Sequence, residues 1–396
     1  MAGTILTLNA GSSSLKFALY SSVGRACEGV IEGIGADPHF IARDPEKQIL
    51  AERRWQPGQA PTYEALLHHL LDWIDHHAGP GELAACGHRV VHGGQDFFEP
   101  VRITTETLEA LDRLVPLAPL HQGHNIGAMR AVKAARPDLP QVACFDTAFH
   151  HGLAPAARRI ALPRQWEDAG VRRYGFHGLS YEYIAGELRS RARRLAAGRT
   201  IVAHLGNGAS LCAMDGGRSV DTTMGFTPLD GLVMGTRCGA IDPGVILYLL
   251  RQHEMTVAEL EDLLYHRSGL LGVSGISNDV RTLLADDAPA AREALELFAF
   301  HVARQTGALT ATLGGLDGFV FTAGIGENAP TIRSDICDRL HWLGVVLDET
   351  ANLRGTGRIS TLDSVVEVWV IPTDEELMIA RHTAATLGMN SPPAET

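Results

Sequence analysis

The chain has 396 residues, of which 45% are hydrophobic, and a formal charge of −12 at pH 7. This length favours two domains over a single core, and the negative charge argues against nucleic acid or an anionic membrane as a partner. The six cysteines form no Cys-x-x-Cys pair, and no apolar run approaches the ~20 residues of a membrane helix. We therefore expect a cytoplasmic protein with reduced thiols.

Strands and helices alternate along the chain, which is typical of an α/β fold in which helices cover sheets. We expect strands at 4–8, 16–20, 85–91, 141–146, 200–205, 210–215, 318–322 and 365–371. We expect helices at 63–77, 105–114, 124–135, 180–195, 244–251, 257–265, 288–313, 329–343 and 374–387. A polar, proline-containing loop near residue 150 indicates a domain boundary there.

Residues 4–20 are predicted to form a β-hairpin, because two apolar strands flank the turn Asn9-Ala-Gly-Ser-Ser-Ser-Leu-Lys16. The small residues of the turn, Ser12 and Ser14 among them, let an anion approach the backbone N–H groups, and Lys16 adds a charge suited to phosphate. The segment 201–212 repeats this strand–turn–strand layout about half a chain later, with Gly206-Asn-Gly208 at its turn. The repeat predicts two similar halves; coincidence among glycine-rich turns is the alternative.

Four further residues lie at strand ends or among glycines: Arg89, Asp146, His177 and Arg237. A guanidinium fork binds a carboxylate or phosphate through two parallel bonds, although either arginine could instead close a surface turn. Asp146 at the end of its strand suits the orientation of a reacting group, and His177 could donate to developing negative charge or be structural.

A third glycine turn, Gly324-Ile-Gly-Glu-Asn328, follows the strand 318–322 and precedes an expected helix. Glycines there let a base or phosphate lie on the backbone, and the free N–H groups at a helix start favour an anion. The chain contains no Walker A loop and no dinucleotide fingerprint, so the prediction of nucleotide binding depends on these three turns. Asn9 and Glu375 supply oxygen ligands that Mg²⁺ prefers, although a glutamate at a helix start is ordinarily a cap.

Six motifs, taken together, resemble those of the acetate kinases over nearly the whole chain and in the same order. They are Asn9-Ala-Gly-Ser-Ser-Ser-Leu-Lys16, Gly87-His-Arg-Val-Val-His-Gly-Gly94, Phe145-Asp-Thr-Ala-Phe-His150, Tyr174-Gly-Phe-His-Gly178, His204-Leu-Gly-Asn-Gly208 and Phe321-Thr-Ala-Gly-Ile-Gly-Glu-Asn328. The resemblance implies an actin-like ATPase fold, with two duplicated ribonuclease-H-like domains around a nucleotide cleft. It implies an acyl-substrate and phosphate domain of 1–149 plus 380–396, and a nucleotide-binding and dimerisation domain of 150–379.

The activity that the resemblance implies is reversible phosphoryl transfer between ATP and acetate, giving acetyl phosphate and ADP, in a homodimer that uses Mg²⁺ or Mn²⁺. Catalysis would fall to Asp146, His177 and Arg237. Because acetate, with a pKa of about 4, is already ionised at neutral pH, Asp146 is better interpreted as an orienting residue than as a required proton acceptor. Asn9 and Glu375 would help to hold the metal, the glutamate through water.

The remaining roles also follow from the resemblance, residue by residue. Arg89 would bind the carboxylate of the acid, and its methyl group would occupy an apolar pocket formed by Val91, Leu120, Phe176 and Pro228. Ser12 and Ser14 would form a phosphate loop. The nucleotide would contact Lys16, His204, Leu205, Gly206, Asn207, Gly208, Asp279, Val280, Arg281, Gly324, Ile325, Gly326, Glu327 and Asn328.

The chain departs from the usual family pattern at Cys238 and Ala240 after Arg237, at Gln122, and at Asp374, which adds a negative charge near the expected metal ligands. These departures affect the expected substrate preference more than the reaction class. A propionate or butyrate kinase is an alternative, since one methylene is worth only ~1–3 kcal/mol of discrimination. An ATP-driven conformational module of the same fold is another, but it would not need both arginines and His177 together.

Overall fold

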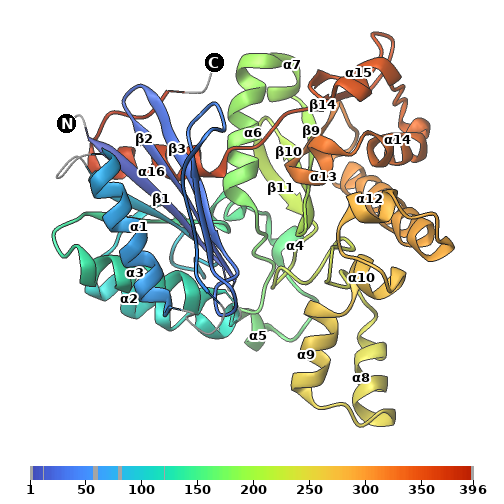
Figure 1. Ribbon diagram of the computed structural model, residues 1–396. Helices are drawn as coiled ribbons and strands as arrows, with labels where there is room; N and C mark the ends of the chain where they lie inside the picture. Colours follow the sequence, from blue (N-terminus) through green and yellow to red (C-terminus); the bar gives the residue numbers. More distant parts are fainter. Residues whose placement is uncertain (1–2, 12, 57–60, 79–82, 120, 394–396) are drawn as a thin grey trace. The chain divides into compact units, whose positions relative to one another are not determined.

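The computed structural model describes residues 3–11, 13–56, 61–78, 83–119 and 121–393, and the chain divides into two compact units (Figure 1). Unit 1 comprises Met1–Ala148 and Asp374–Thr396, and unit 2 comprises Phe149–Thr373. The second boundary between the units therefore lies between residues 373 and 374, whereas the resemblance implied a boundary between 379 and 380. The whole last helix, with Glu375, belongs to unit 1. Within the described ranges, no helix has the length and apolar character that crossing a membrane requires.

Unit 1 is built on a sheet whose order, among the described residues, is β5-β4-β3-β2-β1-β6-β8-β7. Its strands are β1 (Thr4–Ala10), β2 (Ser14–Ser21), β3 (Gly24–Glu32), β4 (His39–Arg43), β5 (Ile49–Arg54), β6 (Leu83–Val90), β7 (Val101–Arg102) and β8 (Gln141–Phe145). β1 pairs antiparallel with β2 and parallel with β6, and β6 is parallel to β8. The carboxyl ends of β1, β6 and β8 consequently meet at one edge of the sheet.

Helices cover both faces of this sheet; they are α1 (Tyr63–Ala78), α2 (Thr105–Asp112), α3 (Gln122–Ala135) and α16 (Glu375–Leu387), with the 3-10 turn η1 (Val115–Leu117). A second 3-10 turn, η2 (Ala148–His150), lies across the boundary between the units. α1 and α3 share a buried core with Leu6, Leu8 and Cys86. Successive residues of a strand point to opposite faces of the sheet. α16 packs against the sheet at Gly87 of β6, where an added Cβ would lie 2.2 Å from Thr383 Oγ1 of α16. Only glycine at position 87 permits this close approach of α16 to β6.

Unit 2 is built on a sheet whose order in the described part of the chain is β11-β10-β9-β12-β14-β13. Its strands are β9 (Arg199–Leu205), β10 (Ala209–Asp215), β11 (Arg218–Thr222), β12 (Gly318–Thr322), β13 (Gly357–Arg358) and β14 (Glu367–Val370). Its helices are α4 (Pro155–Arg158), α5 (Arg164–Asp168), α6 (Gly178–Arg191), α7 (Arg193–Ala196), α8 (Pro243–Gln252), α9 (Val257–His266), α10 (Gly269–Ser274), α11 (Val280–Leu284), α12 (Pro289–Leu313), α13 (Ala323–Asn328), α14 (Pro330–Arg339) and α15 (Glu349–Arg354), with the 3-10 turn η3 (His341–Leu343).

The two sheets have the same topology, which confirms the predicted duplication of a ribonuclease-H-like unit. β1, β2, β3, β6, β8 and β7 correspond in order and in pairing direction to β9, β10, β11, β12, β14 and β13. Unit 1 extends its antiparallel edge by β4 and β5. The predicted hairpins are therefore equivalent elements, β1–β2 in unit 1 and β9–β10 in unit 2.

The chain crosses between the units twice. After β8, the last strand of unit 1 along the chain, it continues into α6, which packs on β9 of unit 2. After β14, the last strand of unit 2, it continues into α16, which packs on β1, β6 and β8 of unit 1. Each unit therefore has a helix on its sheet that follows the last strand of the other unit.

Several predicted elements needed correction. The expected helix 180–195 consists of α6 and α7, separated at Ala192, where the backbone leaves the helical region with φ −147° and ψ 69°. The expected helix 329–343 ends at Arg339 and is followed by the 3-10 turn η3. The strands that were not predicted are β3, β4, β5, β7, β11 and β13. β7 and β13 have only two residues each, and β5 is largely exposed and lacks the alternating apolar pattern that marks a half-buried strand.

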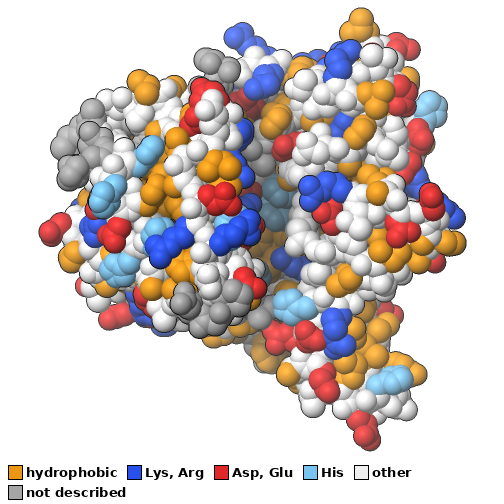
Figure 2. All heavy atoms as spheres, viewed as in Figure 1, with side chains coloured by type: hydrophobic (Ala, Val, Ile, Leu, Met, Phe, Trp, Pro, Cys, Tyr) orange, Lys and Arg blue, Asp and Glu red, His pale blue; other side chains and the backbone are white. Residues whose placement is uncertain are grey.

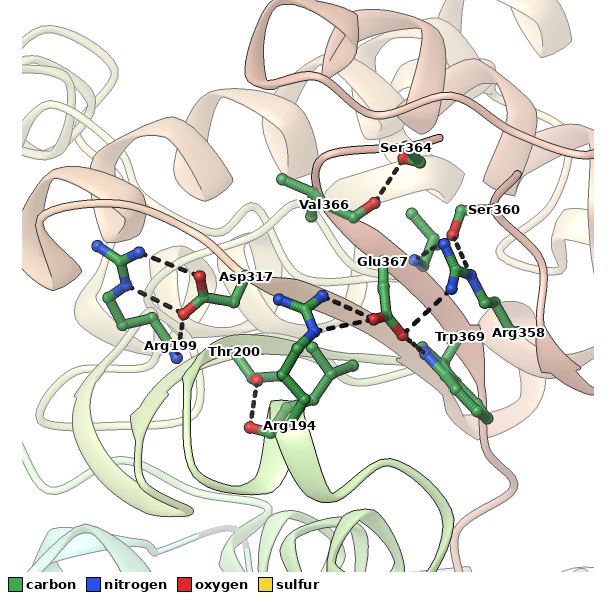
Figure 3. Close-up of polar contacts among 12 residues, drawn as sticks. Arg194, Arg199, Thr200, Asp317, Arg358, Ser360, Ser364, Val366, Glu367 and Trp369 are labelled. Atoms are coloured by element: carbon green, nitrogen blue, oxygen red, sulfur yellow. Dashed lines mark hydrogen bonds and ion pairs between the residues drawn. The ribbon is translucent and has the colours of Figure 1, made fainter. Parts of the chain in front are cut away.

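Ion pairs join the amino ends of the parallel strands in unit 2 (Figure 3). Arg199 at the start of β9 pairs with Asp317, just before β12, at 3.0 Å, and the backbone N–H of Arg199 donates to the same carboxylate at 2.8 Å. Glu367 at the start of β14 accepts from Arg194 at 2.6 Å and from the indole of Trp369 at 3.0 Å. This end of the sheet is therefore a structural network, opposite the carboxyl ends of the strands.

Candidate functional site

A charged cluster lies at the carboxyl edge of the unit 1 sheet, around Arg89 at the end of β6. The guanidinium donates to both oxygens of Asp146, which follows β8, with distances of 3.1 and 3.0 Å from Nε and 2.5 Å from Nη2 to Oδ2. Its Nη1 also donates to Asn9 Oδ1 of β1 at 3.1 Å, and Glu375 Oε2 of α16 lies 3.8 Å from Nε. The structure thus brings together four residues that the sequence predicted to be functional.

The cluster keeps Arg89 cationic. Asp146 is almost completely buried, with 1% of its side chain exposed, against 21% for Arg89. Burial acts to lower the pKa of Arg89, but the carboxylates of Asp146 and Glu375 outweigh it and raise that pKa. Asp146 occupies one edge of the guanidinium fork and orients Arg89, whereas the sequence predicted that it would orient the reacting group.

The hairpin β1–β2 supplies the neighbouring groups. Asn9 and Lys16 are register partners, and the Gly11 N–H donates to the Ser14 carbonyl oxygen at 2.8 Å to close the turn. Ser12, predicted to belong to the phosphate loop, lies outside the described residues. Burial, followed by the charge of Glu375, raises the pKa of Glu376, whereas Lys16 opposes this shift. Lys16 therefore acts on the acidic start of α16.

Asp374, one of the departures from the family pattern, caps α16. Its Oδ1 accepts from the Leu377 N–H at 2.8 Å and from the Tyr20 hydroxyl at 3.2 Å, and its carboxylate pairs with Arg25. The additional negative charge is consequently matched by an arginine of β3. Sequence reasoning missed Arg25, because nothing local indicates a partner 349 positions away.

The oxygen atoms of this cluster suit a hard cation. Among the described residues, no group of three or more histidine, cysteine, aspartate or glutamate side chains is arranged to hold a metal ion. Asn9 and Glu375 offer one amide oxygen and one carboxylate beside Arg89. Mg²⁺ commonly takes one or two protein oxygens and completes its shell with water and phosphate. The predicted pair therefore fits a magnesium ion that depends on a phosphate ligand.

The residues predicted to hold the methyl group come from both units. In unit 1, the buried Val91 donates its N–H to Asn125 Oδ1 at 3.0 Å, and Asn125 donates to the Ala10 carbonyl at 2.8 Å. In unit 2, Phe176 is buried, and the carbonyl of Pro228 accepts from Arg237. Leu120 lies outside the described residues.

Gln122, another departure from the family pattern, is buried in unit 1. Its side-chain amide donates to the His92 carbonyl at 3.0 Å. It therefore fixes the backbone that follows Val91.

A second cluster in unit 2 brings His177, Arg237 and Gly208 together. A Cβ built on Gly208 would lie 3.4 Å from His177 Nε2 and 3.7 Å from Arg237 Nη1, so both cationic or donor groups border the backbone of this turn. Arg237 donates from Nη1 to the Pro228 carbonyl at 3.0 Å and contacts Met234 Sδ at 3.7 Å. This arrangement presents donors beside a small residue, as stabilisation of a phosphoryl group requires.

The orientation of His177 is set by Ser210, by Tyr181, which the sequence analysis did not identify, and by His204, which it assigned to the nucleotide. Its backbone lies in the left-handed region, with φ 60°, at the N-cap of α6. Its Nδ1 lies 2.8 Å from Ser210 Oγ, which also contacts the Tyr181 hydroxyl, and its ring stacks on His204 at 4.1 Å. The spacing 177 to 181 is one helical turn and was the available signal for Tyr181.

A pocket of about 450 Å³ opens in unit 2 beside this cluster. It is lined by Gly206, Asn207, Asn278, Asp279, Val280, Arg281, Leu284, Gly324, Ile325, Asn328 and Ala329. Three segments that the sequence assigned to the nucleotide thus converge on one cavity, and Asn278, Leu284 and Ala329 are additions to the predicted set. Two glycines of the predicted nucleotide loop, Gly324 and Gly326, lie within α13 itself, not before a helix as expected.

Other residues predicted for the nucleotide do not line this pocket. They are His204, Leu205, Gly208, Gly326 and Glu327 in unit 2, and Lys16 in unit 1. Leu205 is fully buried, and His204 Nδ1 lies 2.9 Å from Ser180 Oγ. At the pocket rim, hydrogen bonding to Arg281 lowers the pKa of Asp279, whose carboxylate caps α11 by accepting from the Arg281 N–H at 2.8 Å.

This chain is similar over nearly its whole length to kinases of short carboxylic acids. The family model described as "Acetokinase family" matches residues 4–381. An acetate kinase of Rhodopseudomonas palustris is 54% identical, with 96% of this chain and 98% of that protein covered. A solved propionate kinase from Francisella tularensis is 37% identical with a TM-score of 0.90, over 97% of this chain and 99% of that chain. A solved Porphyromonas gingivalis acetate kinase is 35% identical with a TM-score of 0.87, over 97% and 100% of the two chains.

Proposed function

The chain belongs to the acetokinase family, and we propose that it catalyses reversible phosphoryl transfer from ATP to acetate, giving acetyl phosphate and ADP. The observation that best supports this function is that the two units contain clusters of different chemistry. The cluster of unit 1 holds Arg89 against Asp146, Asn9 and Glu375, and the cluster of unit 2 holds His177 and Arg237 near a pocket of about 450 Å³.

The chemistry of the reaction explains these residue types. The carboxylate of acetate is ionised at neutral pH, so the barrier comes from bringing two anions together, and positioning and positive charge lower it. In our proposal Arg89 binds the carboxylate of the acid, while Arg237 and His177 stabilise the transferring phosphoryl group. Asp146 keeps Arg89 oriented through the bonds at 2.5–3.1 Å.

Mg²⁺ is part of the proposal, with Asn9 and Glu375 as the residues that would hold it. The ion would neutralise charge on the nucleotide phosphates. The nucleotide itself would bind in the pocket of unit 2. Its walls include Gly206, Asn207 and the α13 residues Gly324 and Ile325.

Propionate is the second candidate acid, because a propionate kinase is among the similar solved structures. Val91 is buried and branched at Cβ, which favours the smaller methyl group of acetate. One methylene gives only ~1–3 kcal/mol of discrimination, so both acids are expected to react at different rates.

The proposed assembly is a homodimer in the cytoplasm, and α8 supports the dimer. Val245, Leu247 and Tyr248 of this helix are 41%, 50% and 56% exposed, and no residue of α8 is buried. Figure 2 shows hydrophobic side chains over this part of unit 2. A helix with such a face is stable when another apolar surface covers it. Sedimentation velocity of the wild type and of Tyr248→Glu tests the assignment: a dimer that the substitution leaves intact excludes this face.

A coupled assay of ADP release across formate, acetate, propionate and butyrate tests the proposed reaction. We expect ADP formation that requires both the acid and Mg²⁺, with the highest kcat/KM for acetate. ADP release that is equal with and without any acid would support the ATP-driven module instead. A higher kcat/KM for propionate would replace acetate as the substrate and keep the reaction class.

A further inference from the structure

The carboxylate of Glu327 accepts hydrogen bonds from the backbone and does not line the proposed nucleotide pocket. Glu327 belongs to α13, whose residues Gly324, Ile325 and Asn328 line the cavity, but Glu327 itself does not. Its Oε1 accepts from two backbone N–H groups, that of Ala323 at 2.7 Å and that of Thr373 at 3.1 Å. We propose that Glu327 is a positioning residue that ties the nucleotide-binding segment to Thr373, and not a ligand of the nucleotide or the metal. This inference rests on the function proposed above.

The bond to Ala323 fixes the first residue of α13. Ala323 has φ 64°, in the left-handed region that residues other than glycine adopt only when the surroundings enforce it. Its N–H has Glu327 as acceptor one helical turn later. Loss of this acceptor would release Ala323 from the strained conformation and would move Gly324 and Ile325 in the wall of the pocket.

The bond to Thr373 connects the same carboxylate to His204 and, through it, to His177. The Thr373 hydroxyl donates to Ser180 Oγ at 2.9 Å, and Ser180 Oγ lies 2.9 Å from Nδ1 of His204. His204 stacks on His177 at 4.1 Å. Thr373 is also followed directly by Asp374, the cap of the helix that carries Glu375. Glu327 therefore joins the pocket wall to a chain of contacts that ends at His177.

Arg333 of α14 holds the opposite side of the same segment. This fully buried guanidinium donates from Nη1 to the carbonyl oxygens of Gly326 and Glu327, at 2.9 and 2.8 Å, and from Nε to Asn352 Oδ1 at 2.8 Å. Arg333 thus binds the carbonyl groups of Gly326 and Glu327, while the Glu327 carboxylate binds the N–H groups of Ala323 and Thr373. Since both N–H groups that donate to Glu327 Oε1 belong to neutral amides, an uncharged oxygen in the same place can accept the same two bonds.

Two variants of Glu327 separate positioning from ligand binding. Glu327→Ala removes the acceptor of two N–H groups, so we expect the Kd for ADP, measured calorimetrically without acetate, to rise at least about tenfold. Glu327→Gln retains a carbonyl oxygen and is expected to restore that Kd to within about threefold of the wild type. A Glu327→Gln protein as impaired as Glu327→Ala would overturn the proposal, because a required charge indicates a ligand.

Thr373→Val tests the second half of the connection. This variant keeps the N–H that Glu327 binds but lacks the hydroxyl that contacts Ser180. We expect a kcat about tenfold lower with the Kd for ADP unchanged, and a lowered thermal midpoint alone would contradict the link to His177. If Glu327→Ala fails to fold, the comparison of wild type, Glu327→Gln and Thr373→Val still decides the proposal. The ADP titrations need no turnover, so a wild type that lacks acetate-dependent activity would refute the function while leaving this test intact.

Discussion

Replacement of Asp146 by alanine tests how unit 1 holds its central arginine. Asp146 receives three bonds from Arg89, the shortest at 2.5 Å, and only 1% of its side chain is exposed. Removal of one partner of a buried ion pair typically costs about 3–5 kcal/mol, because the remaining charge loses its compensation. Arg89 is 21% exposed and retains Asn9 at 3.1 Å and Glu375 at 3.8 Å. We therefore expect a loss of about 3 kcal/mol in the unfolding free energy of unit 1.

Hydrogen exchange followed by mass spectrometry measures this loss in each unit separately. A change of about 3 kcal/mol corresponds to exchange on the order of 10²-fold faster in β6 and β8, with β9 and β12 of unit 2 as internal references. The matched control is Asp112→Ala, also in unit 1. Asp112 pairs with Arg130, but the two side chains are 40% and 55% exposed, so we expect a change below about 0.5 kcal/mol.

The result that refutes the reasoning is unchanged exchange of β6 and β8 in Asp146→Ala. Equal effects of Asp146→Ala and Asp112→Ala would refute it as well, since burial would then have no influence. The same variant should lose activity while its residual kcat keeps the pH dependence of the wild type, because an ionised acid needs no proton acceptor. A changed pH profile would assign Asp146 to proton transfer.

The other predictions concern charge in both units. Arg237→Ala should lower kcat about 10²–10⁴-fold, as removal of a charge-stabilising donor does; steady-state rates near the wild-type value would exclude Arg237 from the mechanism. Hydrogen bonding to Arg199 lowers the pKa of Asp317. The contribution of this ion pair to the unfolding free energy is therefore present above the unfolded-state pKa of Asp317 and is lost as pH falls through its folded-state pKa. Urea unfolding at pH 7 and pH 3 should therefore show Asp317→Asn to be less stable by about 1 kcal/mol at pH 7 and by a smaller amount at pH 3, and an equal loss at both values would contradict the ion pair. Arg25→Met should weaken Mg²⁺ activation and lower the thermal midpoint, because it removes the partner of Asp374. Adding Asp374→Asn should restore part of both, with a coupling of about 1–3 kcal/mol in the unfolding free energy. Strictly additive effects of the two substitutions would argue against the ion pair.

Much of the architecture could be predicted from the sequence, because it depends on local pattern. The alternation of strands and helices and the two glycine-containing hairpins indicated the duplicated units, and parallel pairing then brings strand ends together. Arg89 and Asp146 illustrate this: they follow neighbouring parallel strands, β6 and β8, so their proximity is a consequence of the topology. The segments around Asn207, Asp279 and Gly324 likewise converge on the pocket.

Other features were not predictable, because they depend on contacts between distant parts of the chain or on the direction of one side chain. Arg25 lies on a strand that lacks a clear apolar alternation, and its pairing with Asp374 exists only after α16 has packed on unit 1. Glu327 belongs to a recognisable glycine motif, but the motif does not indicate that its carboxylate faces Thr373 instead of the cavity.

The double crossing of the chain has a consequence for folding during translation. The helix that covers one face of β1, β6 and β8 is α16, which leaves the ribosome only after all of Phe149–Thr373. At about 5–20 residues per second, synthesis of that stretch takes roughly 10–45 s. During this time one face of the unit 1 sheet has no helix to cover it. Unit 1 is therefore the first unit whose synthesis begins and the last whose fold can be completed.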